Sequence, residues 1–175
     1  MNGGHSLSAM LLANPRLTVH VFDLFKWQYS WPVFQLLNSS FPGRLTPHPG
    51  YTQDTLAPWA AEAKQSGFVC DIALVDGGHT QHAALHDMRH LAKAARNHTR
   101  LVIDDIGMQG PGMAVRQLNA SGYISIDEIY GPFPRRSKHS PCMRAPAGTP
   151  EYRARSGRMC PTWGFAVARY THPEQ

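Results

Sequence analysis

Cysteine, long apolar runs and acidic residues are all scarce in this sequence of 175 residues. Its three cysteines are too few for a disulfide framework, and their spacing matches no zinc-binding pattern. No apolar run approaches the roughly 20 residues that cross a bilayer. The first residues hold no basic segment followed by an apolar stretch, as a signal peptide would. We therefore expect a cytoplasmic protein without a membrane anchor.

The excess positive charge is concentrated in one stretch. Asp and Glu number 12 against 17 Lys and Arg, which gives a formal net charge of +5. Residues 131–160 hold seven of the basic residues and one acid, so the rest of the chain is close to balanced. We expect a Pro/Arg-rich insertion there. General affinity for nucleic acid is disfavoured because the charge is confined to this one loop.

Apolar segments typical of buried strands alternate with segments of helical period. Strands are expected at residues 17–23, 44–46, 70–76, 101–105, 123–129 and 163–170. Helices are expected after Gly4 and over residues 28–37, 55–65, 80–95 and 111–122. This order predicts an α/β fold in a single domain over residues 1–175: a doubly wound, mostly parallel sheet with a C-terminal antiparallel hairpin.

Four carboxylates stand where these apolar strands end. Asp23 ends the first strand, Asp76 ends a later one, and Asp104 and Asp105 end the next. In an open parallel sheet the carboxyl ends of the strands border one crevice, in which ligands bind. Each acid alone could instead cap a helix or a turn, but the set as a whole favours a binding site.

Asp23 follows the Gly3-Gly4 turn at a spacing that suits cofactor binding. A glycine turn can lie beside a cofactor while the later acid accepts both ribose hydroxyls. Nicotinamide-dependent oxidoreductases share this arrangement. However, residues 2–6, Asn-Gly-Gly-His-Ser, lack the three-glycine fingerprint of a pyrophosphate-binding turn, which disfavours that alternative.

Four short motifs occur in an order that resembles a known family. They are Asn-Gly-Gly-His-Ser at residues 2–6, Val-Phe-Asp at 21–23, Val-Asp-Gly-Gly-His at 75–79 and Val-Ile-Asp-Asp at 102–105. Together they resemble the class I S-adenosylmethionine-dependent methyltransferases with a type 24 methyltransferase domain. The resemblance implies a Rossmann-like methyltransferase fold and S-adenosyl-L-methionine as cofactor.

The resemblance also implies which residues bind the cofactor: Gly3, Gly4, His5, Ser6, Asp23, Thr52 and Asp76. The glycine turn and the two residues after it would line the methionine end, and Asp23 would hold the ribose. Thr52 falls where the family often has Gly-Asp-Ser beside the adenine. Tyr51 replaces the usual acid there, which puts adenine contacts of this turn in doubt.

Asp76, Asp104 and Asp105 resemble the metal site of magnesium-dependent O-methyltransferases. Mg²⁺ prefers oxygen ligands, keeps several waters and leaves places for substrate hydroxyl oxygens. Such a site would lower the pKa of the hydroxyl and orient it for attack on the sulfonium methyl. His79 would then take the proton, since imidazole changes charge near neutral pH, and Asp76 is the second expected catalytic residue. Alternatively, His79 makes only local hydrogen bonds at a helix start.

His82, His86 and His90 stand four residues apart on the helix expected at 80–95, which raises the alternative of a zinc site. No cysteine or fourth ligand accompanies them, and they project opposite the apolar stripe of that helix. We interpret them as part of a solvated polar face, with Asp87 as an ordinary surface charge.

Family members carry a strand before the glycine turn, whereas here Met1 stands directly before Asn2. The missing strand would be the central one, between the strands that end at Asp23 and Asp76, and its absence would leave two strand edges unpaired. We expect that the sequence begins at an internal methionine of a longer chain.

The sequence thus predicts methyl transfer from S-adenosyl-L-methionine to a hydroxyl oxygen of a small-molecule acceptor, assisted by Mg²⁺. The basic insertion favours an anionic acceptor. The alternative is a catalytically inactive methyltransferase-like remnant that binds partners through the insertion. A nucleic-acid methyltransferase is disfavoured, because base-amino methylation usually goes with an Asp/Asn-Pro-Pro-aromatic motif, which Asp-Gly-Gly-His at 76–79 does not match.

Overall fold

The computed structural model describes residues 3–134 and 162–171. The chain divides into two compact units, Met1–Trp59 and Ala60–Gln175, and each is described by itself. That the chain forms one domain stays a prediction. Of the insertion predicted at 131–160, residues 135–160 lie outside the described residues. In the described ranges, no helix has the length and apolar character needed to span a bilayer.

The first unit combines a pair of parallel strands with helices. Its elements are α1 (His5–Ala13), β1 (Val19–Asp23), α2 (Ser30–Ser40), β2 (Leu45–Pro49) and the first part of α3 (Thr52–Ser66). Val19 of β1 lies opposite Leu45 of β2. One face of this pair belongs to an apolar core with α1 and α2, formed by Leu7, Leu11, Val21, Phe34, Leu37 and Leu45. On the other face, the rings of Phe22 and His48 contact Trp59 of α3.

Both ends of α1 are fixed by particular residues. Gly4 precedes the helix with a φ of 73°, a left-handed conformation that favours glycine. A Cβ atom at Gly4 would also lie only 2.8 Å from Cγ1 of Val33. At the other end, the guanidinium of Arg44 donates hydrogen bonds to the carbonyls of Leu11, Asn14 and Leu17. A cation at a helix C-terminus satisfies carbonyls that the helix leaves free.

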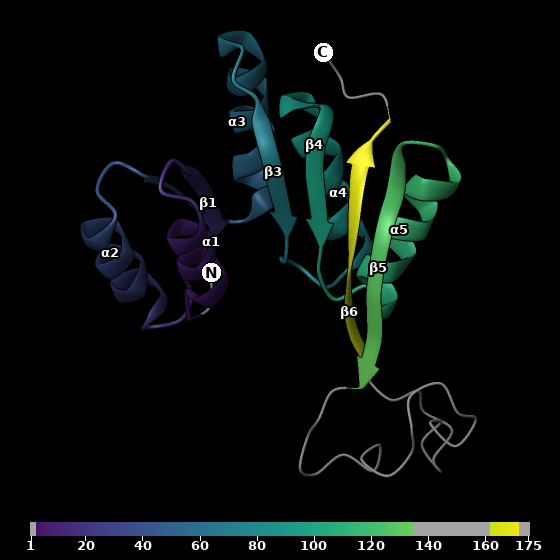
Figure 1. Ribbon diagram of the computed structural model, residues 1–175, viewed down its shortest axis with the longest axis horizontal. Coiled ribbons are helices and arrows are strands. Elements are labelled where there is room, and N and C mark those ends of the chain that lie inside the picture. The colour runs from purple at the N-terminus through teal and green to yellow at the C-terminus, as the bar shows by residue number, and fades with distance from the viewer. Residues whose placement is uncertain (1–2, 135–161, 172–175) are drawn as a thin grey trace. The chain divides into compact units, whose positions relative to one another are not determined.

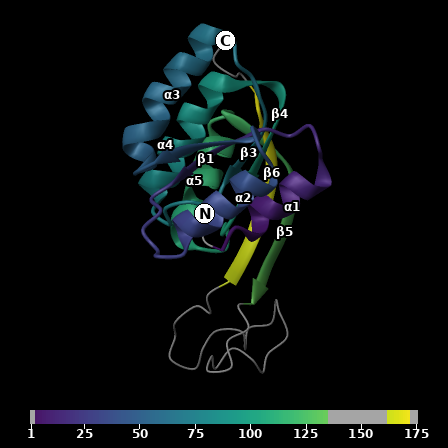
Figure 2. The same ribbon diagram turned by 90° about the vertical axis from the view of Figure 1, so that its left-hand side faces the viewer.

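The second unit is a four-stranded sheet with helices on one face. Its elements are the last part of α3, β3 (Cys70–Val75), α4 (Gln81–Leu91), the short 3₁₀-helix η1 (Ala92–Ala94), β4 (Ala95–Ile103), α5 (Gln109–Ala120), β5 (Ile124–Pro134) and β6 (Thr162–Tyr170). The strand order is β3-β4-β6-β5, with β3 and β4 parallel and β6 antiparallel to both of its neighbours. This confirms the predicted C-terminal hairpin, whose last strand lies between β4 and β5. Both α4 and α5 lie on the same face of the sheet (Figure 1, Figure 2).

The core of this unit lies between the sheet and its two helices. Alternate residues of the strands point toward α4 and α5, and together they form a buried cluster that includes Ala73, Val75, Leu101, Ile103, Ala166 and Ala168 from the strands and Met88, Val115 and Leu118 from the helices. The hydroxyl of Tyr170, on β6, donates a hydrogen bond of 2.6 Å to the carbonyl of Met88 on α4. The last strand is thereby tied to the helix that follows β3.

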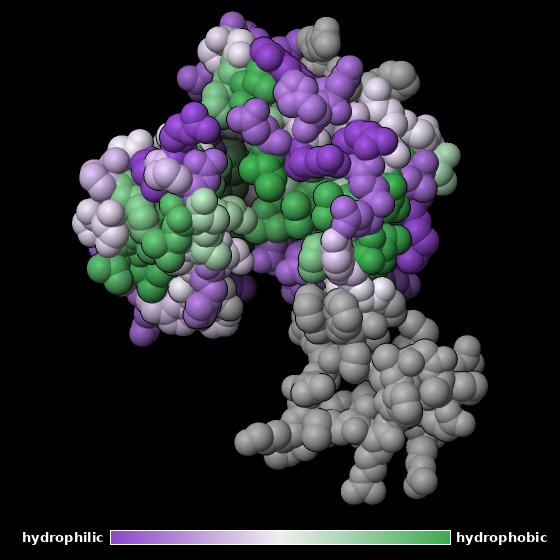
Figure 3. All heavy atoms as spheres, viewed as in Figure 1, coloured by the Kyte–Doolittle hydropathy of each residue, from purple (hydrophilic) through white to green (hydrophobic). Residues whose placement is uncertain are grey.

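The opposite face of β3 carries apolar side chains that remain exposed. Ile72 and Leu74 are 46% and 37% exposed, while their neighbours Ala73 and Val75 are buried. Figure 3 shows hydrophobic side chains gathered over this part of the sheet. Parallel strands are usually covered on both faces, so exposed Ile72 and Leu74 depart from the usual burial of such a strand.

The two sheets share no strand. The described strands form a two-stranded sheet, β1-β2, and a separate four-stranded sheet that begins at β3. Hence, within residues 3–134 and 162–171, no strand pairs with both β1 and β3. This confirms the predicted α/β fold, with parallel strands and a C-terminal antiparallel hairpin.

Some element boundaries differ from the prediction. The helix expected at 80–95 ends at Leu91, and β4 begins at Ala95 rather than at residue 101. The extra strand residues are mostly polar, but the Thr99 hydroxyl donates to the carbonyl of Cys70 at 2.6 Å and so holds them beside β3. Helix α3 begins at Thr52, three residues earlier than expected.

Candidate active site

Three of the predicted acids and His79 line one pocket of the second unit. Asp76 follows β3, and Asp104 and Asp105 follow β4. Because these two strands are parallel neighbours, their carboxyl ends meet at the same edge of the sheet. The pocket is lined by Val75, Asp76, Gly77, Gly78, His79, Ala84, Ile103, Asp104, Asp105 and Pro111. The structure brings these predicted residues together, while their roles stay predictions.

The side chains of His79 and Asp105 contact each other in the pocket. The Nε2 atom of His79 lies 3.1 Å from Oδ2 of Asp105, and the two side chains are 49% and 11% exposed. Asp105 has a φ of 54°, which is unusual for a residue with a side chain. Its backbone N–H donates to Oδ1 of Asp104 at 2.8 Å. Strained backbone of this kind clusters at functional sites, and here it holds a buried carboxylate against an exposed imidazole.

The pocket carries excess negative charge. The pKa of Asp76 is raised, first by desolvation and then by the nearby carboxylates of Asp104 and Asp105. A cation would relieve this repulsion, and carboxylate oxygens are the ligands that Mg²⁺ prefers. Among the described residues, however, no three His, Cys, Asp or Glu side chains are arranged to hold a metal ion. The donor chemistry of the pocket fits a hard cation, whereas a complete ligand set is not in place.

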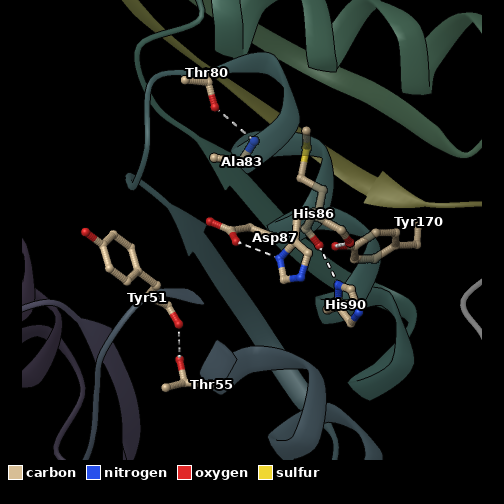
Figure 4. A network of polar contacts seen from close by, with 9 residues as sticks. Tyr51, Thr55, Thr80, Ala83, His86, Asp87, His90 and Tyr170 are labelled. Carbon is tan, nitrogen blue, oxygen red and sulfur yellow. Dashed lines mark hydrogen bonds and ion pairs between the residues drawn. The ribbon is translucent and has the colours of Figure 1, made fainter. Parts of the chain in front are cut away.

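Close backbone contacts fix the loop between β3 and α4. A Cβ atom at Gly110, in α5, would lie 2.1 Å from the carbonyl oxygen of His79, and one at Gly78 would lie 2.9 Å from Cβ of Ala83. The loop ends at Thr80, whose Oγ1 accepts a hydrogen bond of 3.1 Å from the backbone N–H of Ala83 (Figure 4). Such a side chain caps the helix start. The carbonyl of His79 therefore lies directly against α5.

Asp87, which the sequence suggested to be a surface charge, is buried at 5% exposure. That interpretation was wrong. Its Oδ2 atom lies 3.3 Å from the position of a Cβ at Gly77, so the carboxylate packs against the loop that carries Asp76 and His79. The sequence pattern did not predict this burial, because Asp87 lies outside the apolar stripe of α4. Its carboxylate is buried by the Gly77 loop and not by the apolar core.

The predicted cofactor residues other than Asp76 lie in the first unit. Gly4 is buried at the start of α1 and Gly3 is half-buried, while His5 and Ser6 are exposed in the first turn of the helix. This first turn has no side-chain cap. The N–H groups at a helix start favour negatively charged ligands.

Asp23 ends β1 beside the turn that contains Thr52. Its backbone carbonyl accepts a hydrogen bond of 3.0 Å from the N–H of Gly50, which joins the turn at residues 50–52 to the end of the strand. Its Oδ1 atom accepts a hydrogen bond of 2.6 Å from the N–H of Phe25, a residue with a φ of 49°. Thr52 is the first residue of α3 and is half-buried, so it is helical rather than part of a free turn.

A methyltransferase domain family matches residues 1–106, more than half of the 175 residues. The chain belongs to this methyltransferase domain family. The matched range contains every residue predicted for the cofactor and the metal, from Gly3 to Asp105. No curated protein matches the sequence of this methyltransferase domain.

Solved methyltransferases share the fold of this domain. It is similar to CalS11, a TDP-rhamnose 3'-O-methyltransferase of calicheamicin biosynthesis, with a TM-score of 0.61 and 14% identity over 98% of this chain and 69% of that one. NcsB1, an O-methyltransferase of neocarzinostatin biosynthesis in complex with S-adenosylmethionine and 2-hydroxy-5-methyl naphthoic acid, gives a TM-score of 0.54 and 15% identity over 96% of this chain and 46% of that one. The mitomycin 7-O-methyltransferase MmcR gives a TM-score of 0.54 and 13% identity over 96% of this chain and 46% of that one. The chain thus spans less than half of the length of NcsB1 and MmcR.

Proposed function

We propose that this methyltransferase domain transfers the methyl group of S-adenosyl-L-methionine to a hydroxyl oxygen of a small-molecule acceptor, with assistance from a divalent cation. The observation that carries the proposal is the pocket of the second unit, where three carboxylates and an imidazole border one space. The similar structures CalS11, NcsB1 and MmcR are all O-methyltransferases, which favours oxygen as the acceptor atom.

The cofactor would be bound by the residues of the glycine turn and the end of β1. Gly4 leads into α1 in a left-handed conformation, and the N–H groups of a helix start favour a negatively charged group of a ligand. We propose that the carboxylate of Asp23 accepts the ribose hydroxyls and that Thr52 lies beside the adenine.

The contact with Asp105 favours one nitrogen of His79 as the base. A carboxylate only accepts hydrogen bonds, so the proton of neutral His79 lies on Nε2, toward Asp105. Nδ1 is then free to take the acceptor's hydroxyl proton, and Asp105 would stabilise the imidazolium that forms. Asp76 and Asp104 would orient the acceptor oxygen. A divalent cation held by Asp76, Asp104 and Asp105 would lower the pKa of that hydroxyl.

Two measurements test the proposal. Calorimetric titration of the purified chain with S-adenosylmethionine is expected to give one binding site, and Asp23→Ala should abolish it. A panel of hydroxylated acceptors, anionic ones included, should then yield methylated product detectable by mass spectrometry. A chain that binds no S-adenosylmethionine would instead favour an inactive methyltransferase-like protein.

A further inference from the structure

We propose that α4 carries a second metal site, independent of the methyl-transfer pocket, in which His86 and His90 bind a borderline transition-metal ion such as Zn²⁺ or Ni²⁺ through their Nε2 atoms. The two histidines stand one helical turn apart, so their side chains lie on the same side of the helix. Their ring centroids are 4.1 Å apart, and the ring planes are tilted by 32°.

The hydrogen bonds of the two rings determine which nitrogen atoms are free. Nδ1 of His90 lies 2.9 Å from the backbone carbonyl oxygen of His86. Nδ1 of His86 lies 3.4 Å from Oδ1 of Asp87. Both oxygen atoms are acceptors only, so in each neutral ring Nδ1 carries the hydrogen and Nε2 keeps its lone pair. Figure 4 shows the carboxylate of Asp87 directed at one ring and the carbonyl of His86 at the other.

This pattern is the one that supports metal-binding histidines. A ligating imidazole usually donates its other N–H to a carboxylate or a backbone carbonyl, which fixes the ring and raises the basicity of the free nitrogen. The side chain of Asp87 is 7% exposed and that of His86 is 16% exposed, and His90 is half-buried. The expected solvated face is therefore confirmed only for His82, which is exposed. The rings of His86 and His90 are held in place by these hydrogen bonds before any metal binds.

The donor atoms decide which metals fit. Imidazole nitrogen suits Zn²⁺, Ni²⁺ and Cu²⁺, whereas Mg²⁺ takes oxygen ligands. Two protein ligands leave the remaining coordination positions to water. This agrees with the finding that the described ranges contain no group of three or more potential ligands arranged around one point. The site on α4 and the carboxylate pocket therefore have different metal preferences.

Calorimetric titration of the full chain with Ni²⁺ or Zn²⁺, in excess Mg²⁺, tests the proposal. We expect one site in the unmodified protein, no measurable binding in His86→Gln and His90→Gln, and affinity lowered about 10- to 100-fold in Asp87→Asn. His82→Gln is the matched control on the same helix and should bind as the unmodified chain does. Asp104→Asn should also bind normally, which separates this site from the proposed methyl-transfer pocket. Equal affinity of the unmodified chain and His86→Gln would overturn the proposal.

A second measurement needs no variant. Diethyl pyrocarbonate modifies free imidazole nitrogen, and mass spectrometry can locate the modified histidines. Zn²⁺ is expected to slow modification of His86 and His90 while leaving His82 unaffected. Equal modification of all three with and without Zn²⁺ would contradict the site, even if His86→Gln or His90→Gln failed to fold.

Discussion

The Nε2 atom of His79 lies 3.1 Å from Oδ2 of Asp105, which joins an exposed imidazole on the β3–α4 loop to a buried carboxylate after β4. Such a carboxylate holds the imidazole in one tautomer and stabilises its charged form. In the proposed reaction this pair would combine a proton acceptor with the group that orients it.

Replacing the imidazole tests that role. His79→Gln is expected to lower kcat about 100- to 10,000-fold, the range of general base catalysis, with little change in the Kd for S-adenosylmethionine. Asp105→Asn should lower kcat as well, because the amide cannot stabilise the imidazolium. Stopped assays with the best acceptor from the panel give kcat, and calorimetry gives Kd. An unchanged kcat in His79→Gln would show that this histidine makes only local hydrogen bonds.

The raised pKa of Asp76 predicts a pH-dependent stability. Desolvation and the carboxylates of Asp104 and Asp105 make the folded state bind this proton more tightly than the unfolded state does. The free energy of unfolding should therefore fall as the pH rises from the usual pKa of an aspartate through the raised value. Asp76→Asn removes the unfavourable free energy of keeping this carboxylate ionised in the folded state at neutral pH. We expect it to raise the stability at pH 7 by about 0.5 kcal/mol, the scale of partly exposed charges.

Thermal unfolding at two pH values checks the expectation for Asp76. The Tm of Asp76→Asn should exceed that of the unmodified chain at pH 7, and the difference should shrink near pH 3, where both chains are uncharged at this position. A lower Tm at pH 7 would mean that the ionised carboxylate stabilises the fold.

Gly110 should tolerate no side chain. A Cβ there would lie 2.1 Å from the carbonyl oxygen of His79, a backbone atom that cannot rotate away. Gly110→Ala is expected to destabilise the chain by about 1–3 kcal/mol, as overpacking does. Gln109→Ala, at the exposed neighbouring position, is the control and should stay within about 0.5 kcal/mol. Urea unfolding measures both variants, and equal stabilities would argue against the close approach of α5 to this loop.

The Cys70 thiol should react slowly in the folded protein. Burial raises its pKa to about 11, so at pH 8 only about one thiol in a thousand is the reactive thiolate. Alkylation with iodoacetamide, followed by peptide mass spectrometry, is expected to label Cys70 rapidly in denaturant and slowly without it. Equal rates would show that the start of β3, where Cys70 lies, opens readily.

Sequence patterns located the acids of the pocket because each follows a strongly apolar run. Asp76 and Asp104 stand directly after β3 and β4, and parallel pairing then brings them together. The apolar runs and the acids that follow them can be recognised from neighbouring residues alone, whereas the pairing of β3 with β4 cannot. The exposed residues of β3 could not be recognised in the same way, because the pattern of a parallel strand does not say which face is covered.

Other parts of the site depend on contacts that no local pattern encodes. The burial of Asp87 results from its contact with the Gly77 loop, and polar residues of a helix give no sign of such a contact. The start of β4 was missed because Arg96, Asn97 and His98 are polar and exposed. The bond from Thr99 to the carbonyl of Cys70 holds this segment in place, and it joins residues far apart in the sequence.

The central claim is that the carboxylate pocket assists methyl transfer by holding a cation. Turnover of a hydroxylated acceptor, measured with Mg²⁺ and after removal of metal by a chelator, tests it most directly when the unmodified chain is compared with Asp104→Ala. We predict product only in the presence of Mg²⁺, no Mg²⁺-dependent product in Asp104→Ala, and the same Kd for S-adenosylmethionine in both proteins. Equal turnover with and without the metal would contradict the claim.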